Sequence, residues 1–310
     1  MIAPTNSPLV TIAIPTFNRA SGFLRTSLAA ACAQTYRHLE IFVSDNASED
    51  HTHDLVESLH DSRVRYHRHP ANIGSTSNMN FCIDEARGEY LVVVPDDDLV
   101  DPDFVELCVS VVDADVGLVR SGTRIIDKEG VTLSELPNQA GGLSFDALVL
   151  AWFGSRTAPY QCSTMYKTHV IQSFVLHSRH QLLDDVATFF RVAAICERRD
   201  IPEIKASFRL HAEELTATSE ILAWCEESMD LLDLLCLLSP ANIGLIRTQG
   251  LEFLAHGNYR RAFRRPFPAS LVAAFTVLRT HDFTFPRLRP LAGAAARRVR
   301  EKMRQVLPIT

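Results

Sequence analysis

Three consecutive aspartates are the residues of this 310-residue chain whose type and spacing most clearly suggest chemistry. Asp96, Asp97 and Asp98 follow the apolar run 91–94 and a proline at position 95. Adjacent like charges repel one another, so a compact loop of this kind is favoured when a cation lies among the carboxylates. Hard oxygen ligands suit Mg²⁺ or Mn²⁺. The alternative is a solvated turn after a strand, because Asp and Pro are common turn residues.

The elements around this acidic stretch (residues 96–98) must position it. Strands are predicted from short apolar or β-rich runs at 9–14, 38–44, 64–67 and 91–94. Helices are expected between them at about 21–33, where Ser21 would be the cap, 52–60 and 75–86. This alternation predicts an α/β fold with right-handed crossovers and a mainly parallel sheet. The loops 15–19, 45–50 and 95–98 would then meet at the carboxyl ends of the strands, where open α/β sheets bind ligands.

The glycine-rich fingerprints of dinucleotide-binding folds and P-loops are absent from the sequence. The phosphates of a nucleotide would therefore need another counter-charge, and a metal ion on the acidic stretch would supply it. The residues by themselves thus predict a site for a nucleotide and a metal ion.

Composition narrows the class of protein. The net charge of -6 gives no general case for nucleic-acid binding, so no nucleic-acid partner is expected. The seven cysteines are spread without a CxxC pair, which favours reduced core thiols in a cytoplasmic protein. The N-terminus lacks the features of a signal peptide, and no apolar run has the length of a bilayer span.

Several short motifs follow one another in an order that is typical of a known protein family. They are Pro15-Thr16-Phe17-Asn18-Arg19, Gln34-Thr35-Tyr36, Asp45-Asn46-Ala47-Ser48, Asn72-Ile73-Gly74, Arg87-Gly88-Glu89-Tyr90 and the three aspartates with Pro102. Over roughly residues 8–215 this pattern resembles the family two glycosyltransferases of GT-A fold. The resemblance implies a Rossmann-like sheet flanked by helices. It also implies an inverting, Mg²⁺- or Mn²⁺-dependent transfer of a sugar from a nucleotide-diphosphate donor to an acceptor hydroxyl.

The resemblance assigns residues to the nucleotide. The turn of Pro15, Thr16 and Phe17, with Arg19, would lie along the nucleoside. Asp45 would accept a hydrogen bond from the base, which suits the N3–H of uracil or thymine and favours a UDP or dTDP donor. Further candidates for the nucleotide site are Asn72, Gly74 and Asn78. For Asn78 a solvated helix asparagine is the alternative.

The resemblance also assigns residues to the metal ion. Asp98 occupies the place of the last metal-binding carboxylate, and Asp96 is a second candidate ligand. Asp96 or Asp97 would hold the ribose or a metal-bound water. Pro95 stands where the common family pattern has a further aspartate, so the choice among the three carboxylates stays open. The motif around His211 implies that this imidazole ligates the metal or contacts the diphosphate.

A sugar hydroxyl is a poor nucleophile, so the reaction needs a general base. Residues 182–191 resemble the family segment that carries the base, and the offset to Arg191 favours Asp185, with Asp184 as second choice. Two adjacent aspartates near a metal would raise each other's pKa. The alternative is a pair of carboxylates that serve the helix dipole. Trp152 and Tyr160 could stack on a sugar, although such aromatics are more often part of the core.

The last third of the chain has the apolar spacing of helices. We expect a GT-A domain over 1–217, with a nucleotide-sugar half at about 8–102 and an acceptor half at about 103–217. A helical region with a basic tail would fill 218–310. Its helices are predicted at 221–238, 242–256, 270–278 and 292–306.

The predicted helix 292–306 carries five basic residues, which indicates contact with a membrane surface. This would suit a lipid-linked acceptor and place the protein at the inner face of the membrane. The alternatives are a solvated helix or a contact within a homo-oligomer.

The sequence therefore predicts a cytoplasmic glycosyltransferase that acts on a saccharide or lipid-linked saccharide in polysaccharide or glycoconjugate assembly. A nucleotidyltransferase is the rival enzyme, but it should carry a glycine-rich loop with Arg and Lys where residues 15–19 stand. A non-catalytic sugar-nucleotide-binding protein is the other rival. The intact acidic stretch and Asp185 argue against it.

Overall fold

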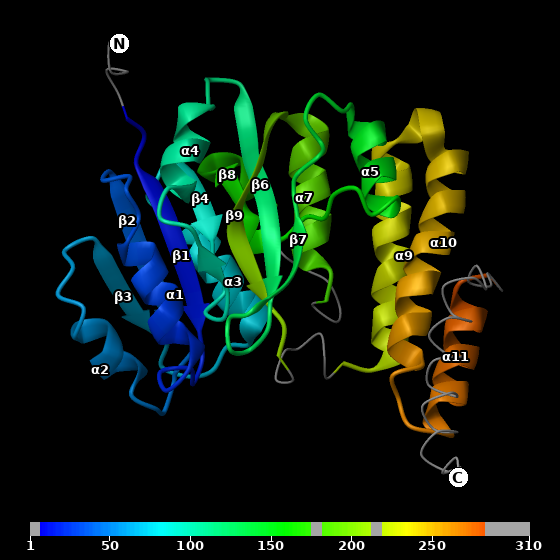
Figure 1. Cartoon of the computed structure of the whole chain (residues 1–310), viewed down its shortest axis with the longest axis horizontal. Helices are drawn as coiled ribbons and strands as arrows, with labels where there is room; N and C mark the ends of the chain where they lie inside the picture. Colours follow the sequence, from blue (N-terminus) through cyan, green and yellow to red (C-terminus); the bar gives the residue numbers. More distant parts are fainter. Residues whose placement is uncertain (1–6, 175–181, 212–218, 283–310) are drawn as a thin grey trace, which may run out of the picture. The chain divides into compact units, whose positions relative to one another are not determined.

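The computed structural model describes residues 7–174, 182–211 and 219–282 (Figure 1). The chain divides into two compact units, Met1–Thr218 and Ser219–Thr310. The division falls one residue beyond the boundary that the sequence suggested.

The first half of unit 1 alternates strands and helices (Figure 1). The strands are β1 Val10–Thr16, β2 Leu39–Asp45, β3 Val64–Arg68 and β4 Tyr90–Val93. The helices between them are α1 Phe23–Cys32, α2 Thr52–Glu57 and α3 Ser75–Asp84. The four strands pair in parallel in the order β3-β2-β1-β4. The expected α/β class is confirmed, and so are the parallel crossovers of this half.

The second half of unit 1 extends the sheet with strands of both directions. It contains β5 Leu99–Val100, α4 Phe104–Ser110, β6 Val116–Ile126, β7 Thr132–Leu136, α5 Phe145–Phe153, a 3₁₀ turn Gln161–Ser163, β8 Thr164–Lys167, α6 Thr168–Ile171, α7 Asp184–Ile195 and β9 Glu197–Arg209. β8 lies antiparallel to both β4 and β6, and β5 lies antiparallel to β9. The complete sheet is therefore mixed, and the parallel pattern inferred from the alternation belongs to its first half.

The boundaries of two predicted elements differ from expectation. Ser21 does not cap α1, because a turn closed by the Gly22 N–H and the Arg19 carbonyl precedes the helix, which begins at Phe23. β1 continues through Thr16, so this residue of the expected loop forms the last position of the strand. In the register of the sheet Thr16 lies opposite Asp45, the last residue of β2.

The core of unit 1 lies around the parallel strands. All seven residues of β2 are buried, as is typical of strands covered on both faces. Ile12, Ile14 and Val92 are fully buried and pack in one cluster with Leu24 and Leu28 of α1. This rigid core fixes the strand ends from which the polar loops leave.

The described residues of unit 2, 219–282, form three long helices, α9 Ile221–Leu238, α10 Ile243–Ala262 and α11 Ala269–Thr280, with a 3₁₀ turn at Pro240–Asn242. Each contacts the other two. A buried polar contact lies between them, because the Asn258 amide donates to Ser228 Oγ at 3.0 Å. The Arg261 guanidinium stacks 3.5 Å from the centroid of the Trp224 ring.

The three helices correspond to those expected at 221–238, 242–256 and 270–278, and the second is longer than predicted. The predicted helix 292–306 lies outside the described residues. In the described part of the chain no single helix has the length and hydropathy to cross a membrane. The pair α9–α10, bent by 106°, passes that test together.

Candidate active site

The acidic stretch follows β4 directly and lies beside the end of β1. The Thr16 hydroxyl, at the last position of β1, donates to Asp96 Oδ2 at 2.6 Å. Burial, and then the charge of Asp97, raise the pKa of Asp96 to about 7. The end of β1 and the loop after β4 are thus joined by two side chains that are 80 positions apart in the sequence.

Arg209, which was not among the predicted site residues, supplies a positive charge to the acidic stretch. It ends β9, and its backbone N–H donates to Asp98 Oδ1 at 2.9 Å. Its Nε donates to the Asp97 carbonyl at 2.7 Å, and its guanidinium lies 4.8 Å from the centroid of the Phe23 ring. Because β9 pairs with β5, the end of β9 is carried to the loop after β4. The only signal in the sequence was the proximity of Arg209 to His211.

His211 pairs with Asp97. Its Nε2 lies 2.8 Å from Asp97 Oδ2, and its ring packs 4.8 Å from Phe23. The structure therefore brings Asp97 to the imidazole, whereas Asp96 faces Thr16 and Asp98 is buried against the Arg209 backbone.

The Asp97–His211 pair fits a divalent cation of the expected kind. A carboxylate oxygen and an imidazole nitrogen are donors that Mn²⁺ accepts. Within residues 7–174, 182–211 and 219–282, no group of three or more His, Cys, Asp or Glu side chains could hold a metal ion. A metal here would therefore need oxygen ligands from a bound diphosphate and from water, which is the usual arrangement for Mg²⁺ at phosphate sites.

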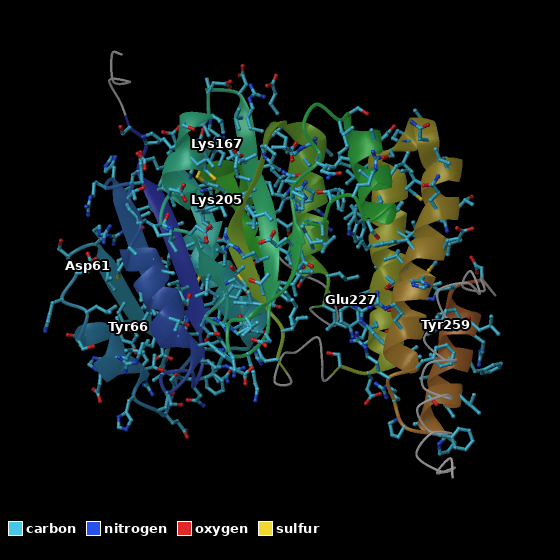
Figure 2. The ribbon with its side chains drawn as sticks, in the orientation of Figure 1. Asp61, Tyr66, Lys167, Lys205, Glu227 and Tyr259 are labelled. Atoms are coloured by element: carbon cyan, nitrogen blue, oxygen red, sulfur yellow. The ribbon has the colours of Figure 1, made fainter. Side chains whose placement is uncertain are left out.

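Asp45, the predicted partner of the base, is buried at the end of β2. Its Oδ1 accepts a hydrogen bond from the Ser48 N–H at 2.8 Å, and its Oδ2 accepts one from the hydroxyl of Tyr66 on β3. Tyr66 is labelled in Figure 2. Burial and the Asp45 carboxylate raise the pKa of Tyr66 well above its ordinary value. A base that bound Asp45 would meet the Tyr66 hydroxyl at the same carboxylate.

Reciprocal hydrogen bonds connect the loops around the predicted nucleotide site. The Asn46 amide donates to Asn72 Oδ1 at 3.0 Å, and the Ile73 N–H donates to Asn46 Oδ1 at 2.8 Å. Asn72 Oδ1 also accepts from the Gly74 N–H at 2.9 Å. Gly74 has φ +87°, a conformation in which only glycine is unstrained. Asn72 and Gly74 therefore shape this loop through the backbone.

The loop after β1 is attached to the loop after β2. The Asn18 N–H donates to Ser48 Oγ at 2.8 Å, and Asn18 Oδ1 accepts from the Glu49 N–H at 2.8 Å. Pro15 is half-buried and Phe17 is exposed in this loop. Arg19 is half-buried, with its guanidinium 5.9 Å from the centroid of the Phe23 ring. An exposed aromatic ring beside a basic residue suits contact with a nucleoside.

Asn78 is buried beneath this site. Its Oδ1 accepts a hydrogen bond from the Ser44 hydroxyl at 2.6 Å, and its Nδ2 donates to the Ser44 carbonyl at 3.0 Å. His69 Nε2 lies 3.2 Å from the same amide oxygen. The side chain thus links α3 to β2, which favours a supporting role over direct contact with a nucleotide.

The predicted base lies in the first turn of α7. Asp184 begins this helix, Asp185 follows, and both side chains are half-buried. The pKa of Tyr160 is raised to about 12 by burial and then by the charges of Cys162, Asp98 and Asp185. The carboxylates of Asp98 and Asp185 thus both act on the Tyr160 hydroxyl.

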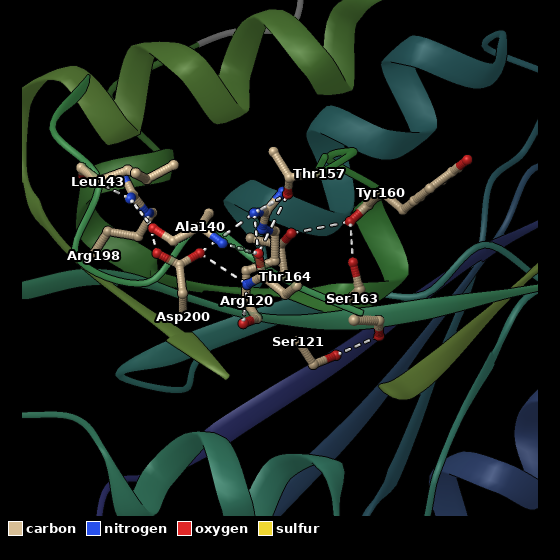
Figure 3. A network of polar contacts seen from close by, with 12 residues as sticks. Arg120, Ser121, Ala140, Leu143, Thr157, Tyr160, Ser163, Thr164, Arg198 and Asp200 are labelled. Carbon is tan, nitrogen blue, oxygen red and sulfur yellow. Dashed lines mark hydrogen bonds and ion pairs between the residues drawn. The ribbon is translucent and has the colours of Figure 1, made fainter. Parts of the chain in front are cut away.

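A buried polar network, also missed in the sequence, underlies α7 (Figure 3). Arg120 on β6 donates through Nη2 to Asn138 and Thr157 and pairs with Asp200 at 3.4 Å. Its guanidinium lies 5.1 Å from the centroid of the Phe189 ring of α7. Despite Asp200, burial lowers the pKa of Arg120 to about 10.

The aromatic residues considered for sugar stacking are largely core. Trp152 is buried, with its ring 5.2 Å from Phe190 of α7. Tyr160 packs 4.9 Å from Phe208 on β9. These contacts support the sheet and α7.

Comparisons with known proteins agree with this geometry. Residues 11–175 match the family model for glycosyl transferase family 2, which is more than half of the chain. A chondroitin synthase of Escherichia coli is 30% identical over 200 residues, which cover 62% of this chain and 29% of the synthase. The chain spans at most 41% of the length of the first curated relatives.

Solved structures share the fold. TarS 1–349 of S. aureus in complex with UDP-GlcNAc aligns with a TM-score of 0.63 at 12% identity, covering 87% of this chain and 81% of that one. The mannosyltransferase PcManGT of Pyrobaculum calidifontis, in complex with GDP-Man and Mn²⁺, aligns with a TM-score of 0.58 at 17% identity, covering 94% and 81%. Fold and site thus define a protein of the GT-A class. The chain belongs to glycosyl transferase family 2.

Proposed function

We propose that this protein is an inverting glycosyltransferase that moves a sugar from a nucleoside-diphosphate donor to a hydroxyl acceptor. The observation that carries the proposal is the pairing of Asp97 with His211 at the carboxyl ends of β1 and β4. In a chain of family 2, a carboxylate and an imidazole at this edge are suited to the diphosphate side of the donor.

The nucleoside would lie over the loops after β1 and β2. Asp45 offers carboxylate acceptors for an N–H of the base, which favours uracil or thymine and thus a UDP or dTDP donor. Phe17 and Arg19 would flank the nucleoside, above the loop that Asn72 and Gly74 shape. UDP-GlcNAc and GDP-Man are bound by two proteins that share the fold, so the base needs a direct test.

Asp97 and His211 would hold Mn²⁺ or Mg²⁺, with Asp96 and Asp98 beside them. When bound, the ion would neutralise charge on the leaving diphosphate. Arg209 contributes a fixed positive charge and holds the backbone of the acidic stretch in place. Thr16 orients Asp96 by a hydrogen bond, and the Asp96 carboxylate is then available for the ribose or a water molecule.

Asp185 would act as the general base, with Asp184 as second choice. It would accept the proton of the acceptor hydroxyl while that oxygen attacks the anomeric carbon. The bond from this carbon to the diphosphate oxygen breaks in the same step, which inverts the configuration. Phe189, backed by the Arg120 network, would hold α7 and therefore Asp185 in position.

The wider setting follows from the chemistry of the proposed acceptor. A saccharide or lipid-linked saccharide would be extended in polysaccharide or glycoconjugate assembly on the cytoplasmic side of the membrane. A peripheral membrane contact through 292–306 and a homo-oligomer remain predictions that the described residues leave untested.

The experiment is a panel of UDP-, dTDP- and GDP-sugars, incubated with and without Mn²⁺ in the presence of an acceptor extract. We expect release of nucleoside diphosphate from at least one donor, dependent on metal and lost in Asp185→Asn. The nucleotidyltransferase rival would instead release pyrophosphate from a nucleoside triphosphate and a sugar phosphate. Binding of a donor without turnover in the wild-type protein would favour a non-catalytic sugar-nucleotide-binding protein.

A further inference from the structure

Helix α11 is apolar on its packed side and on its exposed side. Ala273 and Val277 are buried against the other helices of unit 2. Leu271, Val272 and Phe275 are 56%, 68% and 57% exposed, and the only charged residue of the helix is Arg279. A helix that is apolar all round is normally covered on every side.

The exposed apolar side chains continue into the turn between α10 and α11. Phe267 is 79% exposed in this turn and Phe263 is 39% exposed at the end of α10. We call Phe263, Phe267, Leu271, Val272 and Phe275 the α11 patch. Three exposed phenylalanines and two exposed aliphatic residues within the segment 263–275 are typical of an interaction surface.

The two threonine hydroxyls of α11 are hydrogen-bonded within the helix. The Thr276 hydroxyl donates to the Val272 carbonyl at 3.1 Å, and the Thr280 hydroxyl donates to the Thr276 carbonyl at 2.9 Å. Both hydroxyls are therefore satisfied within the helix. These two side chains can enter an apolar medium without leaving a hydroxyl donor unpaired.

Basic residues predominate in the segment that carries the patch. Residues 253–281 contain five arginines and neither aspartate nor glutamate, whereas the whole chain carries a net charge of -6. Arg260, Arg264 and Arg279 are exposed. Arg261 stacks on Trp224, and Arg265 pairs with Glu220 at 2.9 Å. Three exposed arginines thus border the apolar side chains.

We propose that the α11 patch docks on the surface of a bilayer that contains anionic lipids. Its phenylalanines and aliphatic side chains enter the boundary between headgroups and acyl chains, and the bordering arginines contact the anionic headgroups. The same arginines argue against a second copy of this chain as the occupant, because a two-fold contact would bring the arginines of both copies together. Residues 292–306 play no part in this inference, and it stands apart from the proposed catalytic reaction.

The test is sedimentation of the full chain with two kinds of vesicle, one of phosphatidylcholine alone and one containing phosphatidylglycerol. We expect binding to the anionic vesicles that weakens as salt rises. The variant Phe267→Ser/Phe275→Ser should lower the partition coefficient on the order of tenfold or more, because both side chains leave the lipid. Arg260→Gln/Arg264→Gln should lower it by a similar factor on anionic vesicles only.

The matched control is Leu237→Ser, which removes a side chain that is 75% exposed in α9 of the same unit. This variant should bind vesicles as the wild type does. Far-ultraviolet circular dichroism and thermal unfolding should be unchanged in all variants, because every substituted side chain is exposed. Donor hydrolysis in solution should also be unchanged, which separates this test from that of the proposed function.

Wild-type binding by Phe267→Ser/Phe275→Ser would overturn the proposal. So would a failure of the wild type to bind anionic vesicles. A concentration-dependent dimer in solution that the same substitutions dissociate would also overturn it and assign the patch to a contact between copies.

Discussion

Because His211 contacts Asp97, we propose Asp97 as the carboxylate of the acidic stretch that binds a metal ion. We expect Asp97→Asn to lower turnover on the order of 100-fold at limiting Mn²⁺, because the substitution removes the charge of one ligand. Asp98→Asn should have a smaller effect, since an amide oxygen can still accept the hydrogen bond of the Arg209 N–H. Initial rates over a Mn²⁺ titration measure both. A larger loss in Asp98→Asn would restore Asp98 as the ligand.

The Tyr66 hydroxyl donates a hydrogen bond to Asp45, the carboxylate that is predicted to bind the nucleobase. In Tyr66→Phe the buried Asp45 Oδ2 loses its donor, which should cost the free protein about 1 kcal/mol of stability. A bound uridine N–H would then regain that hydrogen bond, so UDP should bind several-fold more tightly. Titration calorimetry and urea unfolding measure the two effects. Weaker binding of UDP would show that Tyr66 itself contacts the nucleotide.

The individual residues of the acidic stretch could be predicted, but their partners could not. Three adjacent carboxylates after a strand repel one another and therefore indicate a metal ion. This repulsion can be recognised from neighbouring residues in the sequence alone. Which carboxylate meets His211 depends on the pairing of β5 with β9, a contact between residues more than 100 positions apart. Arg209 was missed for the same reason, since nothing local marks an arginine that folds back on such a stretch.

At the scale of elements, the Arg120 network should support α7. In Arg120→Met the guanidinium is removed, and Asp200 keeps Arg198 as a salt-bridge partner. The Asn138 side-chain oxygen loses the hydrogen bond that Arg120 donates to it. We expect a loss of about 3 kcal/mol in the free energy of unfolding, measured in urea. Arg199→Ala, which removes an ion pair on the exposed side of β9, should have a much smaller effect. Equal effects of the two substitutions would argue against a special role for the network.

The loop before β3 carries an ion pair with a defined pH dependence. The Arg63 guanidinium donates to Asp61 and to the Cys32 carbonyl, and it lowers the pKa of Asp61 to about 2. A lowered folded-state pKa stabilises the protein above the unfolded pKa near 4, and this contribution is lost as pH falls toward 2. Asp61→Asn should therefore cost about 1–2 kcal/mol at pH 7 and roughly half of that near pH 3.

Urea unfolding at both pH values measures this difference. Asp54→Asn is the control, because the Asp54 side chain is 75% exposed and should contribute little at either pH. A destabilisation by Asp61→Asn that did not change with pH would mean that the carboxylate acts through its shape and not its charge.

The elements themselves were predicted well where the signal is local. Apolar runs and helical periodicity located the strands of the first half and the helices of unit 2. The second half of the sheet could not be derived, because antiparallel β8 joins β4 to β6 through contacts distant in sequence. The false cap at Ser21 has a similar origin, since a turn closed by Gly22 competes with the helix for these residues.

For the whole molecule, the central claim is that an acceptor oxygen attacks the anomeric carbon from the face opposite the diphosphate. The most direct measurement is the configuration of the first sugar product, followed by proton NMR during turnover of whichever nucleotide-sugar the protein accepts. We predict that an α-linked donor gives the β-configured product at the start of the reaction, and that Asp185→Asn abolishes its appearance. An α-configured first product, or full turnover by Asp185→Asn, would contradict inverting transfer with Asp185 as the base.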